Sequence, residues 1–267
     1  SSAHVLWKLN FNDRETGRTG RQLVFAQALR QGDAIPPPPT ELMQRYQELR
    51  GQKNAARIMP IRTPWLCVPA LNLVIHAFPL VPALPTLIDA VNPSSMKAAL
   101  HRLWTTRRAR VRSVSVETLS YTPGQRVALR YEILSEDKDT SIPELRRLVG
   151  KINARRPPAR LFAGHWAVWR STIGRASIAP PTGYIATLGL SLQEFVSGER
   201  LSDLAGPGGF LGQIRTAARS IACVHTQNLP LLSERGAEKE ISVVNRWIGV
   251  LTGLRSNNAA RLSIIGK

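Results

Sequence analysis

Residues 121–152 read YTPGQRVALRYEILSEDKDTSIPELRRLVGKI, and this stretch decides the fold that we predict. Pro123 and Gly124 predict a tight turn, because proline fixes φ for the second residue of a turn and glycine tolerates a positive φ. Side chains on a strand alternate between its two faces. The return strand therefore has one predicted apolar face, made of Val127, Leu129, Tyr131 and Ile133.

The segments on either side of this hairpin extend it into a predicted sheet. Residues 114–120 alternate in the period of a half-buried strand, residues 135–141 are polar and predict a loop, and residues 148–152 (LVGKI) predict a short apolar strand. Val149 and Lys151 share one face of that strand, since the period is two. Lys151 has two interpretations, a strand-end lysine that reaches solvent or a cation held beneath a hairpin to meet phosphate. Spacing alone does not separate them.

Composition bounds the class of protein. The 267 residues suffice for one large domain or two small ones, and no apolar run is long enough to span a bilayer. Cys67 and Cys223 lie far apart without metal-ligand spacing, which favours a reducing compartment and predicts a cytoplasmic location. The formal charge of +18 suits a polyanionic partner. However, the arginines are scattered, and an arginine-rich coding bias explains them equally well, so nucleic-acid binding is the disfavoured alternative.

The first hundred residues are predicted to form strands, a stiff spacer and short helices. The predicted strands are 5–11, 21–29 (a strand or a mixed segment) and 71–78. Residues 36–39 are consecutive prolines, typical of a polyproline spacer, and residues 60–69 are expected to be irregular. The predicted helices are 41–54, 85–91 and 94–104, the last with Ser94 or Ser95 as its cap.

The last hundred residues are predicted to be mainly helical. A helix is expected over 159–172, with Trp166 and Trp169 packed in the core, followed by one or two apolar strands within 184–196. The next helix has a predicted apolar face made of Leu211, Ile214, Ala218, Ile221 and Ala222, and it ends in a packed His225. Two more amphipathic helices are expected, at 241–254 and 259–265. Strands early and helices late predict an α+β fold with segregated halves.

With the elements in this order, the chain resembles the aminoglycoside-phosphotransferase-like family of small-molecule kinases, which share the protein-kinase-like fold. SYTPGQRVALRYEIL is similar to the paired first strands of the family's nucleotide lobe, and LVGKI to its third strand. LSLQEFVSGERLSDL resembles the hinge between lobes, and IRTAARSIACVHTQNLP the helix that precedes the catalytic loop. The resemblance covers residues 112–267.

The resemblance implies an organisation and a site. Residues 1–105 would be an N-terminal α/β extension, 106–196 an antiparallel nucleotide-binding lobe, and 197–267 the first helices of a helical lobe. The implied ligands are ATP, Mg²⁺ and an unidentified small molecule with an acceptor hydroxyl. Lys151 would contact the α- and β-phosphates, Val149 would line the same site, and the backbone of Gln193, Glu194, Phe195 and Val196 would bind the adenine.

Two departures from the family pattern limit the expected activity. No histidine here is followed by Gly-Asp, and no aspartate occurs after Asp203, so the family's catalytic base and Mg²⁺ ligands have no counterpart. We therefore expect no catalytic residue and no metal ligand in this chain, and we interpret it as a fragment that is inactive alone. Residues 155–178 contain no acid to pair with Lys151, which leaves Glu144 as one candidate partner. Alternative hypotheses are a basic binding module and a pseudokinase-like regulator that binds nucleotide without catalysis.

Overall fold

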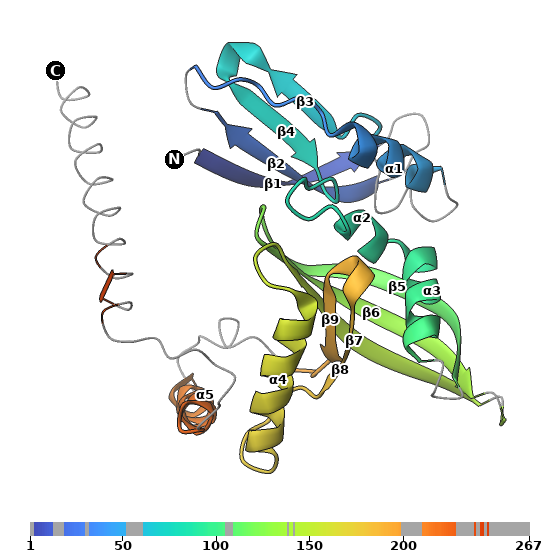
Figure 1. Ribbon diagram of the computed structural model, residues 1–267, viewed down its shortest axis with the longest axis vertical. Helices are drawn as coiled ribbons and strands as arrows, with labels where there is room; N and C mark the ends of the chain where they lie inside the picture. The colour runs from blue at the N-terminus through green and yellow to red at the C-terminus, as the bar shows by residue number, and fades with distance from the viewer. Residues whose placement is uncertain are drawn as a thin grey trace. The chain divides into compact units, whose positions relative to one another are not determined.

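The computed structural model describes most of the first 227 residues of the chain (Figure 1). The described ranges are 3–12, 19–29, 32–51, 61–104, 109–137, 139–140, 142–198 and 210–227, with positions 238, 241, 242 and 245. The chain divides into two units, 1–227 and 228–267, and the fold below is that of the first. It is an α+β fold with two antiparallel sheets, so the predicted fold class is confirmed at that level.

The first sheet has four antiparallel strands in the order β1-β2-β4-β3. Their bounds are β1 Ala3–Asn12, β2 Thr19–Ala28, β3 Trp65–Val68 and β4 Leu73–Ala77. The strands expected at 5–11, 21–29 and 71–78 are therefore confirmed. The prediction that 60–69 is irregular was wrong for β3, which a short 3-10 helix, η2 (Pro69–Leu71), connects to β4. Asn72 follows in a left-handed conformation (φ 47°) and lets the chain reverse into the β3–β4 pair.

Three helices precede the second sheet in the sequence, the first between β2 and β3 and the other two after β4. They are α1 Thr40–Arg50, α2 Leu87–Ala90 and α3 Pro93–Leu103. The cap predicted for α3 was wrong: the side chain of Asn92 accepts hydrogen bonds from the backbone N–H groups of Ser94 (2.8 Å) and Ser95 (3.3 Å). The two serines are thus the donors of a cap that an asparagine provides, with Pro93 in the first turn where no N–H is needed.

The second sheet has five antiparallel strands in the order β5-β6-β7-β9-β8. Their bounds are β5 Ala109–Thr122, β6 Arg126–Asp137, β7 Pro143–Asn153, β8 Pro181–Ile185 and β9 Leu190–Glu194. Helix α4 (Pro158–Thr172) connects β7 to β8, and a short 3-10 helix, η3 (Ala186–Leu188), connects β8 to β9. Gly124 has φ 64° in the predicted tight turn between β5 and β6.

The hairpin of β6 and β7 is longer than the sequence predicted. Residues 135–137, expected to be loop, continue β6, and β7 begins at Pro143 instead of Leu148. A backbone hydrogen bond from the N–H of Asp137 to the carbonyl of Ile142 (3.2 Å) closes this end. The polar composition of the segment does not prevent pairing, because its backbone groups bond across the strands. The buried Ser135 hydroxyl donates a hydrogen bond to the carbonyl of Glu144 (3.3 Å).

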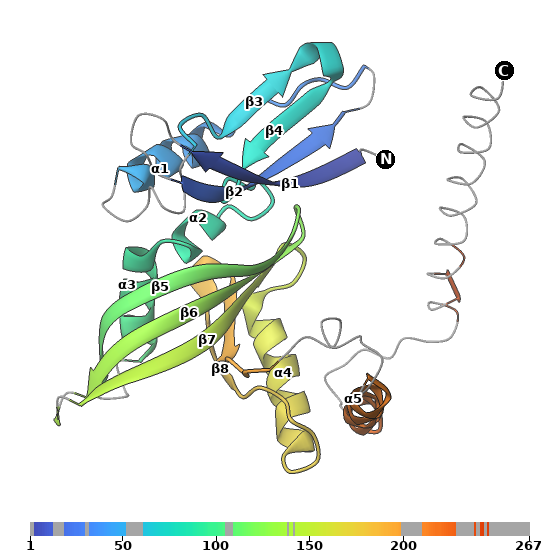
Figure 2. The ribbon, with the colours of Figure 1, turned by 180° about the vertical axis from the view of Figure 1, so that it is seen from behind.

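The inner face of the five-stranded sheet, which we define as the face that carries Leu129 and Tyr131, forms its core. The predicted apolar residues of β6 are no more than 2% exposed, which confirms that prediction. The sheet curves around α3, which contacts the edge strands β5 and β8 (Figure 2). Gly150 also lies on this face. A larger residue does not fit there, because its Cβ would approach a ring carbon of Tyr131 to 2.5 Å.

Two hydrogen bonds connect the five-stranded sheet to the preceding segment. The Tyr131 hydroxyl donates to the carbonyl of Ala90 (2.9 Å), and the Thr86 hydroxyl donates to the carbonyl of Leu188 (2.8 Å). One apolar cluster includes buried residues of α1, α2 and α3 together with buried residues of all five strands. The boundary predicted between residues 105 and 106 therefore divides segments that share this cluster.

Helix α5 (Phe210–His225) confirms the helix predicted for this part of the chain, but not its burial. Of the predicted apolar face, Ala218, Ile221 and Ala222 are exposed and Ile214 is half-buried, and His225 is exposed as well. Trp166 is likewise 41% exposed on α4 and packs against the rings of Trp169 and Phe162 instead of entering the core. Leu211 and the helices expected at 241–254 and 259–265 lie outside the residues whose packing is described.

Candidate functional site

Lys151 lies on the outer face of the five-stranded sheet, opposite the core. On β7, the buried residues Leu148, Gly150 and Ile152 point inward, so Lys151 and Val149 project outward. The register places Lys151 between Ala128 of β6 and Ser191 of β9. Since β7 is the middle strand in the sheet order, Lys151 has a neighbouring strand on each side.

Two further predicted site residues share this outer face. Val149 lies two residues before Lys151 and pairs with Gln193 of β9. On the other side Val149 pairs with Arg130 of β6. The sheet thus brings Lys151, Val149 and Gln193 together on one surface. Val149 is buried, Gln193 is half-buried and Lys151 is exposed, so this surface offers an apolar floor beside a cation.

The remaining predicted residues lie where the chain leaves β9. Glu194 pairs with Leu148 and therefore projects toward the inner side, away from Lys151. Phe195 donates its backbone N–H to the carbonyl of Arg147 (3.0 Å), and the guanidinium of Arg130 lies 5.7 Å from the centre of its ring. Val196 is 59% exposed. The segment 195–198 has no regular structure, so the backbone groups beyond Phe195 are not part of the sheet.

The acids of the outer face are already paired. Glu117 forms an ion pair with Arg130, and Glu132 forms one with Arg147, with 3.1 Å between the Glu132 oxygen and Arg147 Nε. Glu144, considered from the sequence as a partner for Lys151, pairs instead with Arg146 at 2.7 Å. Within the described part of the chain, Lys151 therefore has no acidic partner.

Desolvation acts on Lys151 although the residue as a whole is exposed. The ammonium lies close enough to protein atoms that partial burial lowers its pKa below the ordinary lysine value. A lysine whose charge is disfavoured by its surroundings and is not balanced by an acid gains stability from an anion.

Helix α4 covers part of the same outer face. The ring of Phe162 on α4 lies 5.6 Å from the ring of Tyr184 on β8, and Tyr184 pairs with Ser191, the neighbour of Lys151 on β9. The next turn of α4 carries His165. Burial lowers the pKa of His165, a hydrogen bond to the backbone of Ala179 raises it, and the charge of Lys151 lowers it again.

Sequence reasoning did not identify His165. The segment 155–178, which follows the Lys151 strand, contains no acid. His165 is its one titratable side chain other than arginine, and this was the signal available in the sequence. The electrostatic effect of Lys151 on His165 depends on the packing of α4 against β8 and β9, and a periodic pattern does not show which helical residue faces which strand.

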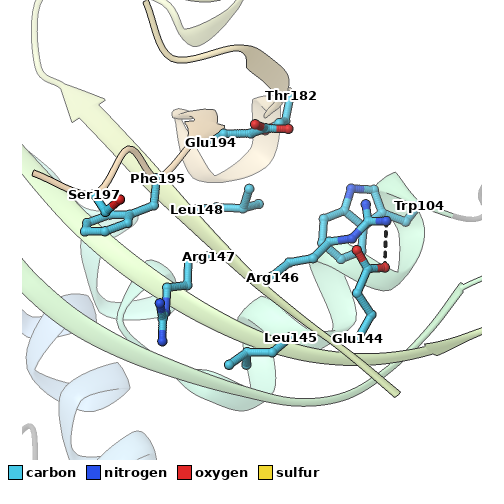
Figure 3. Close-up of a pocket in the computed structure, with 10 residues that line it drawn as sticks. All are labelled: Trp104, Glu144, Leu145, Arg146, Arg147, Leu148, Thr182, Glu194, Phe195 and Ser197. Carbon is cyan, nitrogen blue, oxygen red and sulfur yellow. Dashed lines mark ion pairs between the residues drawn. The ribbon is translucent and has the colours of Figure 1, made fainter. Parts of the chain in front are cut away.

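A pocket of about 490 Å³ lies where the chain leaves β9, and it is lined by residues of β7, β8 and β9 together with Trp104 (Figure 3). Its lining includes Glu194 and Phe195 but neither Lys151 nor Val149. The guanidinium of Arg146 lies 5.7 Å from the ring centre of Trp104, and Figure 3 shows the ion pair that joins Arg146 to Glu144. Trp104 Nε1 and Thr182 Oγ1 are buried without a hydrogen-bond partner among the described residues.

Neither a cluster of metal ligands nor a membrane-spanning helix occurs among the described residues. No group of three or more His, Cys, Asp or Glu side chains there is arranged to hold a metal ion. Mg²⁺ is held through carboxylate oxygens, and the described acids of the outer face, Glu117, Glu132 and Glu136, are all paired with arginines. The described residues around Lys151 therefore do not fit a Mg²⁺ site. No described helix has the length and apolar character needed to cross a bilayer.

Comparisons of the chain with protein-family models, with curated proteins and with solved structures return no match. The case for any function consequently depends on the residues and the geometry given above.

Proposed function

We propose that residues 106–196 form the nucleotide-binding lobe of an ATP-dependent phosphotransferase that acts on a hydroxyl of a small molecule. In this proposal Lys151 contacts the phosphates of ATP, Val149 lines the site, and the backbone of residues 193–196 binds the adenine. Residues 1–105 extend the lobe, and residues 197–267 begin a helical lobe. The proposed class is the aminoglycoside-phosphotransferase-like family, without a claim about the acceptor.

The observation that carries the proposal is the environment of Lys151. A central strand holds this lysine on an outer face where all three described acids, Glu117, Glu132 and Glu136, are paired with arginines. Its pKa is lowered by desolvation, so an anionic ligand would stabilise its charge. Val149 and Gln193 lie beside it on the same face, toward the point where the chain leaves β9.

The order of elements supports the same proposal. A nucleotide lobe of the protein-kinase type has a glycine-containing turn over the phosphates, a lysine on the third strand and a helix after it. Here the third strand of the sheet in sequence, β7, carries Lys151, and α4 follows it directly. The turn of Gly124 connects the two strands before β7.

The proposal is one of binding without turnover by this chain. Phosphoryl transfer requires carboxylates that hold Mg²⁺, and no aspartate follows Asp203 in the sequence. Metal-dependent transfer of phosphate from ATP by the chain alone would contradict this part of the proposal.

Nucleotide binding can be measured by titrating the chain with a fluorescent ATP analogue. We expect Lys151→Met to weaken binding by about 10- to 100-fold, because hydrogen bonds to a charged group contribute roughly 1.5–3 kcal/mol. Lys97→Met, which removes an exposed lysine on α3, is the matched control and should bind as the unaltered chain does.

Equal losses in the two variants, or no loss with Lys151→Met, would contradict the assignment of Lys151. Competition by a short single-stranded oligonucleotide, with an affinity that falls steeply as salt rises, would favour the alternative of a basic binding module.

A further inference from the structure

The helix that follows the Lys151 strand is unusual in its charges. Helix α4 contains Arg160, His165 and Arg170 and no acid, so it offers no ion-pair partner to Lys151. In a protein-kinase lobe, the equivalent lysine pairs with a glutamate from the following helix. The residue of α4 on which Lys151 acts electrostatically is instead a histidine, since the charge of Lys151 lowers the pKa of His165.

We propose that His165 and Lys151 together contact the phosphate groups of the bound nucleotide, as one anion site formed by a helix and a strand. The inference rests on the function proposed for Lys151 and adds to it a second phosphate-binding residue. The ligand class is a di- or triphosphate whose charge both groups share. His165 thus replaces the acidic partner with a second hydrogen-bond donor.

The position of His165 follows from the packing of α4 on the outer face. Phe162 and Tyr184 are in ring contact, and Tyr184, Ser191 and Lys151 are successive neighbours across β8, β9 and β7. His165 lies three residues after Phe162, which places it on the same side of the helix one turn later. It is half-buried, so its ring orientation is restricted while one edge remains accessible.

The hydrogen bonding of His165 leaves a nitrogen available for a ligand. The backbone of Ala179 accepts from the imidazole, and a hydrogen bond of this kind selects which ring nitrogen carries the proton. The second nitrogen becomes a donor when the ring is protonated. A phosphate oxygen beside Lys151 would favour that protonated form.

No acid competes for His165 from the elements packed against α4. The ionisable residues of β7, β8 and β9 on the outer face near it are Lys151 and Tyr184, since Glu194 projects to the inner side. Helix α5, which also contacts α4, contributes Arg215, Arg219 and His225. Among the described residues of β8, β9 and α5, the charged side chains other than Glu194 are therefore basic, and an anion would be attracted by all of them.

The electrostatic coupling predicts reciprocal effects. Burial disfavours the charge of both groups, and the charge of Lys151 further disfavours protonation of His165. A bound anion would instead stabilise both charges, so it should raise the pKa of His165. By linkage, protonation of His165 should tighten anion binding by the same factor.

The direct test is an NMR pH titration of the five histidines in the unaltered chain, with and without inorganic pyrophosphate and in the presence of a chelator. The His165 signals are assigned from a His165→Gln variant. We expect pyrophosphate to raise the pKa of His165 by about one pH unit or more, as an opposite charge within hydrogen-bonding reach does. At each pH, the signals of His101, an exposed residue of α3, should be the same with and without pyrophosphate.

Affinity measurements on variants sharpen the test. His165→Gln should weaken pyrophosphate binding roughly tenfold at pH 6, with a smaller loss at pH 8, and His101→Gln should have no effect. His165→Glu should weaken binding further, because its carboxylate would neutralise Lys151 and repel phosphate.

The possible failures separate the two proposals. Binding that depends on Lys151 but leaves the pKa of His165 unchanged, or that is tighter in His165→Glu than in His165→Gln, overturns the role of His165 alone. If neither pyrophosphate nor ATP binds to the unaltered chain, the function proposed for Lys151 fails, and this inference fails with it.

Discussion

The two faces of the five-stranded sheet are built from alternating residues of the same strands, yet they differ in almost every physical property. The inner face holds Leu129 and Tyr131, both without exposed surface, and contacts α3. The outer face holds arginine–glutamate pairs, one lysine without an acidic partner and an aromatic contact with α4. The comparison shows that stability and ligand binding can be assigned to opposite faces and tested separately.

The largest expected effect is on the inner face. Leu129 is fully buried in the apolar cluster that includes residues of α2 and α3. Leu129→Ala should therefore lower the free energy of unfolding by about 2–5 kcal/mol, through lost burial and a residual cavity. Urea denaturation followed by circular dichroism measures this change in the free energy of unfolding. Arg126→Ala, at an exposed position of the same strand, is the control and should change stability by no more than about 0.5 kcal/mol. Similar losses in the two variants would contradict the division between the faces.

A buried histidine in the four-stranded sheet gives the second largest effect. His76 is 5% exposed and packs between the rings of Phe25 (4.7 Å) and Trp65 (5.5 Å), and burial lowers its pKa from 6.5 to about 4. The unfolded chain binds the proton first, so stability is fully present above pH 6.5 and is lost as pH falls toward 4. The difference of about 2.5 pH units corresponds to a loss of roughly 3 kcal/mol.

The pH dependence can be assigned to this residue by substitution. His76→Phe keeps an aromatic ring in the same environment and should flatten the dependence of unfolding free energy on pH between 6.5 and 4. His101→Gln, at an exposed histidine, should leave the dependence unchanged. If His76→Phe kept the full loss of stability on acidification, the buried histidine would not be its source.

The inner face was the part of the molecule that the sequence predicted best. Alternation over Val127–Ile133 identifies a buried face directly, because every second side chain of a strand lies on the same side of its sheet. The turn at Pro123 and Gly124 and the helix over 159–172 were also predicted, since each depends on local backbone preferences or on apolar period.

Features that depend on packing between distant segments were missed. Trp166 was predicted to be in the core from helical spacing, but that spacing shows only that aromatic rings share a side of α4, and they pack mainly on each other. Residues 135–137 continue β6 because the backbone of β7 pairs with them, a contact that their polar side chains do not signal.

The candidate site likewise contains residues that the sequence predicted and residues that only the packing brings in. The shared face of Val149 and Lys151 follows from their spacing, whereas the addition of Gln193 depends on the pairing of β7 with β9 across a separation of about forty residues. His165 could not be predicted, since its approach to Lys151 is set by how α4 crosses the sheet. The acid-free segment 155–178 showed that a glutamate partner was absent, but not which residue replaced it.

The smallest expected effect tests the outer face by an ion pair that is not part of the site. Glu132 and Arg147 are 3.1 Å apart with both side chains largely accessible to water, so Glu132→Gln should change the free energy of unfolding by about 0.5 kcal/mol or less. The change should shrink further at high salt, because exposed charges are screened. Urea denaturation at low and high salt measures both quantities. A loss as large as that of Leu129→Ala would mean that the outer face contributes to stability as the core does. A negligible loss would instead confirm that the charged outer face contributes much less to stability than the buried inner face does.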